Sequence, residues 1–483
     1  MAISSNDTAA AIALNRFGLG ARPDDAPPRE PKAWLLAQFD QYQPRPAAWA
    51  NQPTAASLAT ELAQQRQQKL QSSQIPQTPP DQQSASAGQA ADATARQAAN
   101  KAIREEVRDV YRSAVNARVN SALTTPAPFV ERLVHFWANH FAVSGDKPAV
   151  AAIAGAFEAE AIRPHVLGRF EDMLVAVERH PAMQVFLDQT RSVGPDSMAA
   201  MRAAERNPER KRGLNENLAR EIMELHTLGV RSGYTQDDVT EFARALTGWS
   251  IAGVQGPQPP GATPGEYVFR AALHEPGSRT ILDRRYDQPG ENQGLAILHD
   301  LAASPSTAQH IASKLARHFV ADNPPASLSA RLADAFRRSG GDLPTVYRAL
   351  LDAPEAWTPV AVKFKTPWEW AISSLRGLGW QDTGNLQAAP LLTQLGQPVW
   401  RPGSPAGYDD IAASWAAPDA LVRRVEVAQR LAARVGDQLD ARALGQTLLG
   451  GSLSPATEAA VSHAESASTA IALLLVSPDF QRR

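Results

Sequence analysis

Residues 215–250 read NENLAREIMELHTLGVRSGYTQDDVTEFARALTGWS, a pattern typical of two helices joined by a turn. Gly229 and Gly233 end the first predicted helix, because glycine favours the conformation that closes a helix. Thr235, with Asp238 three residues later, begins the second helix in a close variant of a capping box. Helical spacing recurs along most of the chain, with almost no sustained alternation of polar and apolar residues. The sequence therefore predicts a mainly α, multi-helix globular protein.

Two further stretches refine this prediction. The helix expected over residues 129–141 is apolar on nearly every side, so we expect it at the centre of the molecule. Residues 251–292 are rich in glycine and proline and predict a small irregular β or loop element. Within it, Tyr267–Arg270 and Thr280–Leu282 have the composition of the two strands of a short hairpin.

Composition predicts two regions along the chain. Residues 1–125 are expected to form N-terminal helices that carry a mobile insertion at about 68–92, where glutamine, alanine and serine dominate without an apolar period. Residues 126–483 are expected to form a helical core domain that contains the segment 215–250.

Charge and cysteine content exclude several classes of function. Lys and Arg total 48 against 50 acidic residues, and the net charge of -2 gives no field that would attract nucleic acid. The absence of cysteine excludes disulfides, thiolate catalysis and cysteine metal ligands. Residues 1–20 lack the pattern of a signal peptide, and no stretch has the apolar length of a membrane span. We therefore expect a soluble protein of the cytoplasm or periplasm.

The first helix of the segment 215–250 carries a polar face. Asn217, Arg220, Glu221 and Glu224 have the spacing of residues on one side of a helix. A solvated surface, with Arg220 and Glu224 as an ion pair, is one interpretation. The other is acid/base catalysis, since two carboxylates one turn apart raise the pKa of one of them when both are buried. Glu221, Glu224 and Asp188 are accordingly the candidate catalytic residues, and the spacing of Glu221 and Glu224 is compatible with glycoside hydrolysis.

Amide, basic and aromatic side chains are candidates for binding a substrate around these acids. They are Asn215, Asn217, Arg220, His226, Trp137, His140, Trp249 and His274. The chain has ten tryptophans, which suit stacking on sugar rings and core packing equally well.

Metal and nucleophile chemistry are less clearly indicated. No HExxH, GxSxG or phosphate-binding GxxxxGK[ST] motif is present, and no cofactor is predicted. A divalent metal site that pools His140, Glu221, Glu224 and His274 is possible by residue type, because a set of two histidines and carboxylates suits such an ion. Sequence spacing does not show whether these side chains meet.

Several motifs together resemble the bacterial family catalogued as domain of unknown function 1800. They are the segment 215–250 with LNRFGLGARP, ERLVHFWANHFAVS, HEPGSRTIL, LGQPVWRPGSPAGYDD and the terminal SPDFQRR, and they extend over nearly the whole chain. Members of that family are often encoded beside proteins resembling alkaline phosphatases and sulfatases. The resemblance implies a role in the cell envelope or with extracellular material, and a phosphatase- or sulfatase-like partner.

The leading functional prediction is a hydrolase that acts on an envelope or extracellular polysaccharide through paired carboxylates. Two alternatives stay open. One is a metal-dependent enzyme that uses a cluster of histidine and glutamate side chains. The other is a non-catalytic partner or assembly protein for the phosphatase-like neighbour, in which the polar face of 215–250 is a structural network.

Overall fold

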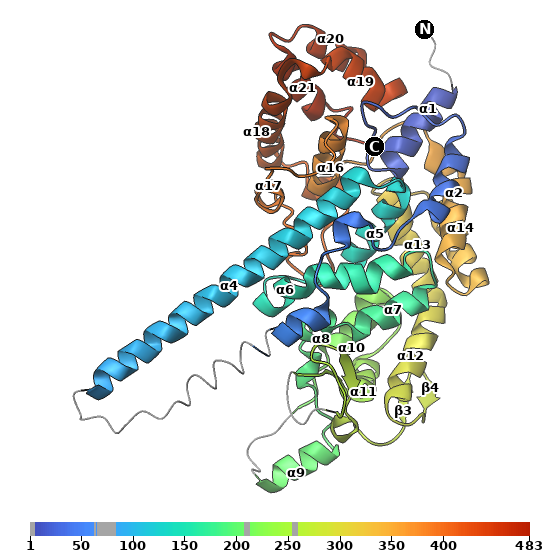
Figure 1. The fold of residues 1–483 in the computed structure, drawn as a ribbon. Coiled ribbons are helices and arrows are strands. Elements are labelled where there is room, and N and C mark those ends of the chain that lie inside the picture. The colour runs from blue at the N-terminus through green and yellow to red at the C-terminus, as the bar shows by residue number, and fades with distance from the viewer. Residues whose placement is uncertain (1–4, 62–63, 65–83, 207–212, 254–258) are drawn as a thin grey trace.

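The computed structural model describes residues 5–61, 64, 84–206, 213–253 and 259–483, and confirms a mainly α fold (Figure 1). The helices of the first half are α1 (Ser5–Ile12), α2 (Pro31–Gln41), α4 (Ser84–Thr124), α5 (Pro128–His140), α6 (Pro148–Phe157), α7 (Phe170–Arg179), α8 (Pro181–Phe186), α9 (Met198–Arg206), α10 (Asn217–Glu221) and α11 (Gln236–Leu246). Those of the second half are α12 (Glu291–Ala303), α13 (Pro305–Phe319), α14 (Ala326–Ser339), α15 (Leu343–Asp352), α16 (Pro367–Gly377), α17 (Ala388–Gln394), α18 (Pro418–Val435), α19 (Ala441–Leu449), α20 (Pro455–Ser462) and α21 (Ala467–Val476).

The helix α5 lies at the centre, as its sequence predicts. Every residue from Pro128 to His140 is buried except Asn139. Trp137 is fully enclosed, and its indole Nε1 donates a hydrogen bond of 2.7 Å to the hydroxyl of Tyr347. A helix without a solvent face has to be surrounded by other elements, so α5 is the one around which the fold is arranged.

The hydrophobic core is one continuous cluster that runs from Ile12 to Phe480. Phe17, near the N-terminus, packs edge-on against Phe129 of α5 and is stacked on Phe319 of α13, both with ring centroids 5.8 Å apart. Apolar packing therefore crosses the predicted boundary between residues 1–125 and 126–483, and the division at that point stays a prediction.

The longest helix, α4, has 41 residues, a length of roughly 60 Å. It projects from the body of the molecule, while its C-terminal part packs on α6 and α16 (Figure 1). Most of the predicted insertion at 68–92 lies outside the described residues, and α4 begins within it, at Ser84.

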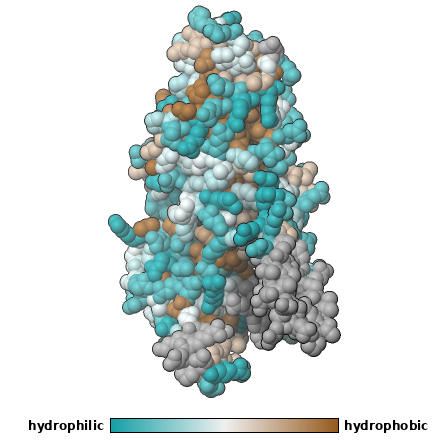
Figure 2. Space-filling model, turned by 90° about the vertical axis from the view of Figure 1, so that its left-hand side faces the viewer, coloured by the Kyte–Doolittle hydropathy of each residue, from teal (hydrophilic) through white to brown (hydrophobic). Residues whose placement is uncertain are grey.

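The outer surface is largely hydrophilic on the face that Figure 2 shows, with apolar side chains dispersed between polar ones. None of the helices in the described ranges is both long and apolar enough to cross a membrane.

The element at 251–292 consists of two small antiparallel sheets, and the predicted hairpin pairing is wrong. The strand β2 (Tyr267–Phe269) pairs with β1 (Trp249–Ile251), and β3 (Arg279–Ile281) pairs with β4 (Arg284–Tyr286). Leu282 and Asp283 both have positive φ, so they form a tight two-residue turn that joins β3 directly to β4. Leucine is not a typical residue of such a turn, which is why the sequence pattern did not reveal it.

The segment 215–250 forms the predicted helix–turn–helix with one modification. The helix α10 ends at Glu221, and residues Ile222–His226 continue as a π-helical turn. Thr235 caps α11 in a capping box with Asp238, which confirms the predicted start of the second helix. The π turn changes the angular spacing of the residues after Glu221, so the polar face does not continue with a regular α-helical period.

Candidate functional site

A cavity of about 290 Å³ lies between α5, α13 and the loop 397–410. From α5 it is lined by Arg132, His135, Phe136, Asn139 and His140. From α13 it is lined by His310, Lys314, Arg317 and His318, and from the loop by Val399, Trp400, Tyr408, Asp409 and Asp410. Trp368 and Glu369 of α16 and Arg118 of α4 add further polar and aromatic groups to the lining. The volume approaches the lower end of the range of small-molecule sites, roughly 300–1,000 Å³.

The helical period of α13 places its ionisable side chains on one side of the helix. His310, Lys314 and His318 are four residues apart, so they lie one above another on the face turned to the cavity. Ile311 and Leu315 are fully buried on the adjoining, core-facing side. The helix thus separates the hydrophobic core from a column of basic side chains.

The loop 397–410 is held against α5 by the side chain of Asn139, which forms hydrogen bonds with the loop backbone. The Asn139 amide donates to the carbonyl of Tyr408 at 2.9 Å and accepts from the amide of Tyr408 at 2.8 Å. Gly407 has φ +82°, and a Cβ at that position would overlap the carbonyl oxygen of Asn139. Trp400 has φ +49° and donates from Nε1 to Glu158 at 3.0 Å. An aromatic residue in this strained conformation persists only where its surroundings hold it.

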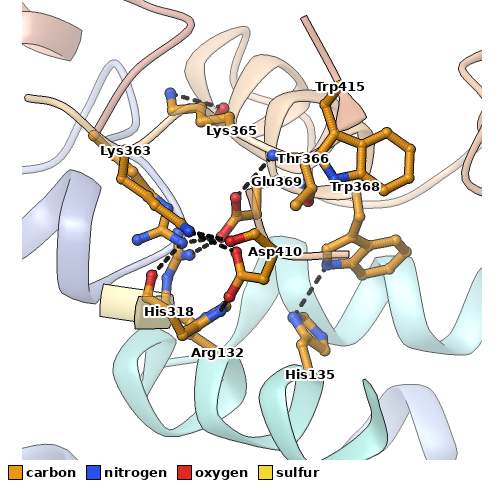
Figure 3. Close-up of polar contacts among 12 residues, drawn as sticks. Arg132, His135, His318, Lys363, Lys365, Thr366, Trp368, Glu369, Asp410 and Trp415 are labelled. Atoms are coloured by element: carbon orange, nitrogen blue, oxygen red, sulfur yellow. Dashed lines mark hydrogen bonds and ion pairs between the residues drawn. The ribbon is translucent and has the colours of Figure 1, made fainter. Parts of the chain in front are cut away.

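His318 and Asp410 form a hydrogen-bonded pair on the wall of the cavity (Figure 3). The His318 Nδ1 lies 2.7 Å from Asp410 Oδ2, and the His318 Nε2 has no hydrogen-bond partner among the described residues. Burial lowers the pKa of His318, an effect that Asp410 opposes. Although burial alone raises the pKa of Asp410, His318 and Lys363 bring it down to about 2. At neutral pH the pair is a neutral imidazole oriented by an ionised carboxylate.

Glu369 is held by two arginines beside this pair. Arg132 contacts its Oε1, and Arg483 approaches the same oxygen at 2.7 Å (Figure 3). Its other oxygen accepts the amide of Thr366 at 2.9 Å in the capping box that begins α16. Burial would raise the pKa of Glu369, but Arg483 and Arg132 hold it well below its usual range. Glu369 is therefore an ionised structural anchor and is poorly suited to proton transfer.

His140 and His310 present unprotonated ring nitrogens. The Nε2 of each ring lies 3.1 Å from a backbone carbonyl, that of His226 and that of Leu225 respectively. A carbonyl only accepts, so Nε2 carries the hydrogen and Nδ1 carries the lone pair. The Nδ1 of His140 is buried and has no partner in the described chain. Burial lowers the pKa of His310 to about 4 and that of His140 well below its usual range, so both rings are neutral.

The structure places the predicted catalytic carboxylates outside this cavity. Glu221 and Glu224 are both half-buried at the junction of α10 and the π turn, and neither lines the cavity. Burial raises the pKa of Glu221, with Glu224 adding to the effect and His226 opposing it. Asp188 forms an ion pair of 2.8 Å with Lys147.

The predicted binding residues do not gather at one site. Asn215 donates to the backbone of Leu187 and Asp188, and its side chain accepts the amide of Asn217 at 2.8 Å. Arg220 pairs with Glu216 at 3.1 Å rather than with Glu224. These contacts stabilise the start of the segment 215–250.

The remaining predicted residues are mostly buried. His226 lies 2.7 Å from Glu178, and both are enclosed. Trp137 and Trp249 are covered by the core, and the half-buried His274 contacts the carbonyl of Thr247 at 2.9 Å. Of the predicted residues, His140 lines the cavity. No group of three or more His, Asp or Glu side chains is arranged to hold a metal ion in the ranges that the structure describes.

A family model described as "protein of unknown function (DUF1800)" matches residues 12–482. The chain belongs to the DUF1800 family. The matched range includes α5, α13, α16 and the loop 397–410, so all the elements that line the cavity are part of the family's sequence model. No curated protein and no solved structure matches the chain.

Sequence reasoning missed most of the cavity. The regular spacing of His310, Lys314 and His318 on an amphipathic helix was a usable signal in this DUF1800 chain, because three basic groups on one face need an aqueous or anionic neighbour. Asp410 gave no comparable signal, since it lies in a loop and meets His318 across 92 residues of sequence.

Proposed function

We propose that the protein is a hydrolase acting on an envelope or extracellular polysaccharide, with its active site in the cavity between α5 and α13. The observation that carries this proposal is the His318–Asp410 pair, whose 2.7 Å contact leaves the imidazole Nε2 without a hydrogen-bond partner among the described residues. A histidine oriented by a carboxylate is a common general base, and the aromatic side chains of Trp368, Trp400 and Tyr408 offer surfaces for a sugar ring.

In the proposed reaction, His318 Nε2 accepts a proton from water while the water oxygen attacks the electrophilic carbon of the substrate. Asp410 stabilises the imidazolium that forms, because it is ionised and bonded to Nδ1. The bond to the leaving oxygen breaks, and the proton on Nε2 passes to that oxygen. The sum is the addition of one water across the cleaved bond.

The first test is hydrolysis of a panel of polysaccharides by wild type and by His318→Gln. We expect kcat to fall by about 10²–10⁴-fold, since a general base contributes this much. His299→Gln is the matched control, because His299 is an exposed histidine that also contacts a carboxylate, Glu171, at 2.8 Å. Both variants are first compared with wild type by circular dichroism and thermal unfolding.

The pH profile gives a second readout of the same group. His318 acts as a base only when it is neutral, so kcat/KM should fall with decreasing pH as the imidazole becomes protonated. Burial lowers the pKa of His318 from 6.5, so this acid limb should lie below pH 6.5. Wild-type activity in His318→Gln, or an acid limb above pH 6.5, would exclude this role for His318.

The paired carboxylates Glu221 and Glu224 are a second candidate for the acid/base groups. The observation in their favour is the raised pKa of Glu221, caused by burial and by Glu224. A protonated glutamic acid beside an ionised one is the arrangement used in glycoside hydrolysis. If Glu221→Gln loses activity while His318→Gln keeps it, the active site lies at this pair.

Two other functions stay as proposals with their own tests. A metal-dependent enzyme would contain metal at a stoichiometric level and lose activity on chelation. A non-catalytic partner of a phosphatase- or sulfatase-like protein is supported by α4, which projects from the body of the molecule (Figure 1). In that case a double variant, Glu221→Gln with His318→Gln, would fold and keep its full biological function.

A further inference from the structure

Lys314 is a cation that lines the cavity and forms no ion pair with any residue that the structure describes. It lies in the middle of the α13 column, one turn from His310 and one turn from His318. Its ammonium makes no hydrogen bond or ion pair with any described residue. Burial lowers the pKa of Lys314 to about 8, and Asp410 opposes this effect. Placing an unpaired ammonium in a partly desolvated cavity is unfavourable unless a ligand provides the missing negative charge.

Two acids at or beside the cavity are already paired with arginines. Glu158 pairs with Arg118 at 2.9 Å, and Glu369 receives both Arg132 and Arg483. Because one carboxylate faces two guanidinium groups, that cluster has an excess of positive charge.

Asp410 also has partners, His318 and Lys363. It accepts from His318 at 2.7 Å and lies 3.1 Å from the buried Lys363. Arg317, on the exposed edge of α13, adds a further positive charge to the cavity rim. Asp409, the remaining acid of the described lining, is exposed, accepts a hydrogen bond from Ser414 Oγ at 2.8 Å and forms no ion pair with Lys314. The four cations of that lining, Arg118, Arg132, Lys314 and Arg317, outnumber its three acids, so the cavity carries an excess of positive charge.

The neutral imidazoles add acceptors for hydroxyl groups. His140 Nδ1 and His318 Nε2 carry lone pairs and have no protein partner among the described residues. A cavity in which the ammonium of Lys314 forms no ion pair with a described residue, and in which two ring nitrogens are acceptors, complements a ligand that has a negative charge and several hydroxyl donors. A bound metal cation is disfavoured here, because Lys314 would repel it.

We propose that the cavity binds an acidic sugar unit, with the anionic group of the sugar against Lys314 and a hydroxyl donating to His140, beside the Nε2 of His318. The anionic group is a carboxylate, as in a uronic acid, or a sulfate ester. The choice of a sugar rests on the proposed hydrolase function, whereas the anion site rests on the cavity alone. A polysaccharide that contains such units would then be the substrate class.

The test is binding of three matched monosaccharides to the intact protein, measured by ligand-observed NMR. D-Galacturonate carries the carboxylate, D-galactose 6-sulfate carries the sulfate, and D-galactose is the neutral counterpart. We expect at least one acidic sugar to bind about tenfold or more tightly than galactose, because a charge-assisted contact is stronger than a neutral one. The acidic sugar that binds identifies the anionic group.

Variants of Lys314 show whether this residue is responsible. Lys314→Met should remove the preference for the acidic sugar, and Lys314→Arg should keep most of it. Lys101→Met, at an exposed lysine of α4, is the control and should behave as wild type. A fold check by thermal unfolding precedes each titration.

The pH dependence of binding provides an independent measurement. The groups around Lys314 are His310, Arg317 and His318 of α13, His140 of α5 and Asp410 of the loop. Lys314 carries its charge below its pKa of about 8, so affinity for the acidic sugar should decline as the pH rises above 8. The decline should be absent in Lys314→Arg, which stays protonated.

Equal affinity for the acidic and neutral sugars, or an unchanged preference in Lys314→Met, would overturn the inference. Binding of monosaccharides needs no catalysis, so the two proposals fail separately. A protein that binds galacturonate but hydrolyses no glycan has the anion site without the proposed activity. One that hydrolyses only neutral glycans has the activity without the anion site.

Discussion

Lys365 is a fully enclosed lysine just before α16, and its surroundings destabilise the protonated form of its side chain. Its Nζ donates to Ser373 Oγ at 3.1 Å and lies 4.0 Å from the centre of the Phe480 ring. Burial, followed by the repulsion of Arg132, lowers the pKa of Lys365 from 10.5 to about 7. Between these two pH values the unfolded chain binds a proton that the folded protein excludes, so this residue makes stability rise with pH.

We predict that Lys365→Met stabilises the protein at pH 7, by roughly 1–4 kcal/mol, because an apolar side chain avoids the cost of burying a cation. This increase in the free energy of unfolding should become smaller between pH 7 and pH 9, because Lys365 of the folded wild type loses its proton in that range. Urea denaturation at both pH values measures the free energy of unfolding. A destabilised variant, or a gain that does not depend on pH, would show that Lys365 is charged in the fold.

At the scale of elements, the loop 397–410 is the part of the cavity that depends most on a single backbone position. Gly407 approaches Asn139 so closely that a Cβ would overlap its carbonyl oxygen, and its φ of +82° disfavours other residues. Tyr408 and Asp410 follow directly and line the cavity. The position of Gly407 therefore determines where Asp410 meets His318.

We predict that Gly407→Ala weakens the His318–Asp410 contact and lowers any activity of the cavity by about tenfold or more, since small displacements of catalytic groups have large effects. Gly403→Ala is the matched control in the same loop, because nothing lies within 4 Å of a Cβ there. The measurements are kcat and thermal unfolding for both variants. Equal activities for the two would show that the loop adjusts without loss.

Helices were the most predictable elements, for a local reason. The buried α5 and the Thr235 cap of α11 follow from spacing and side-chain chemistry within one segment. The π turn at Ile222–His226 could not be predicted in this way. Two of its carbonyls accept hydrogen bonds from distant side chains, His140 of α5 and His310 of α13. The cavity likewise depends on contacts between distant segments, which residue spacing does not encode.

At the scale of the whole molecule, one core joins the two ends of the chain. The cluster runs from Ile12 to Phe480, and Phe17 contacts both Phe129 and Phe319. We therefore predict a single cooperative transition in differential scanning calorimetry, with equal calorimetric and van't Hoff enthalpies. Two resolved transitions would instead support independent units at 1–125 and 126–483.

The central position of α5 has a practical consequence for finding the natural ligand. One set of its side chains lines the cavity while the rest pack in the core, so an occupied cavity and the folded state are directly coupled. A compound that binds only the native form raises the melting temperature, and the increase grows with the ligand concentration relative to Kd. A fluorescence-based thermal screen of carbohydrate libraries can therefore search for the ligand before any reaction has been assayed.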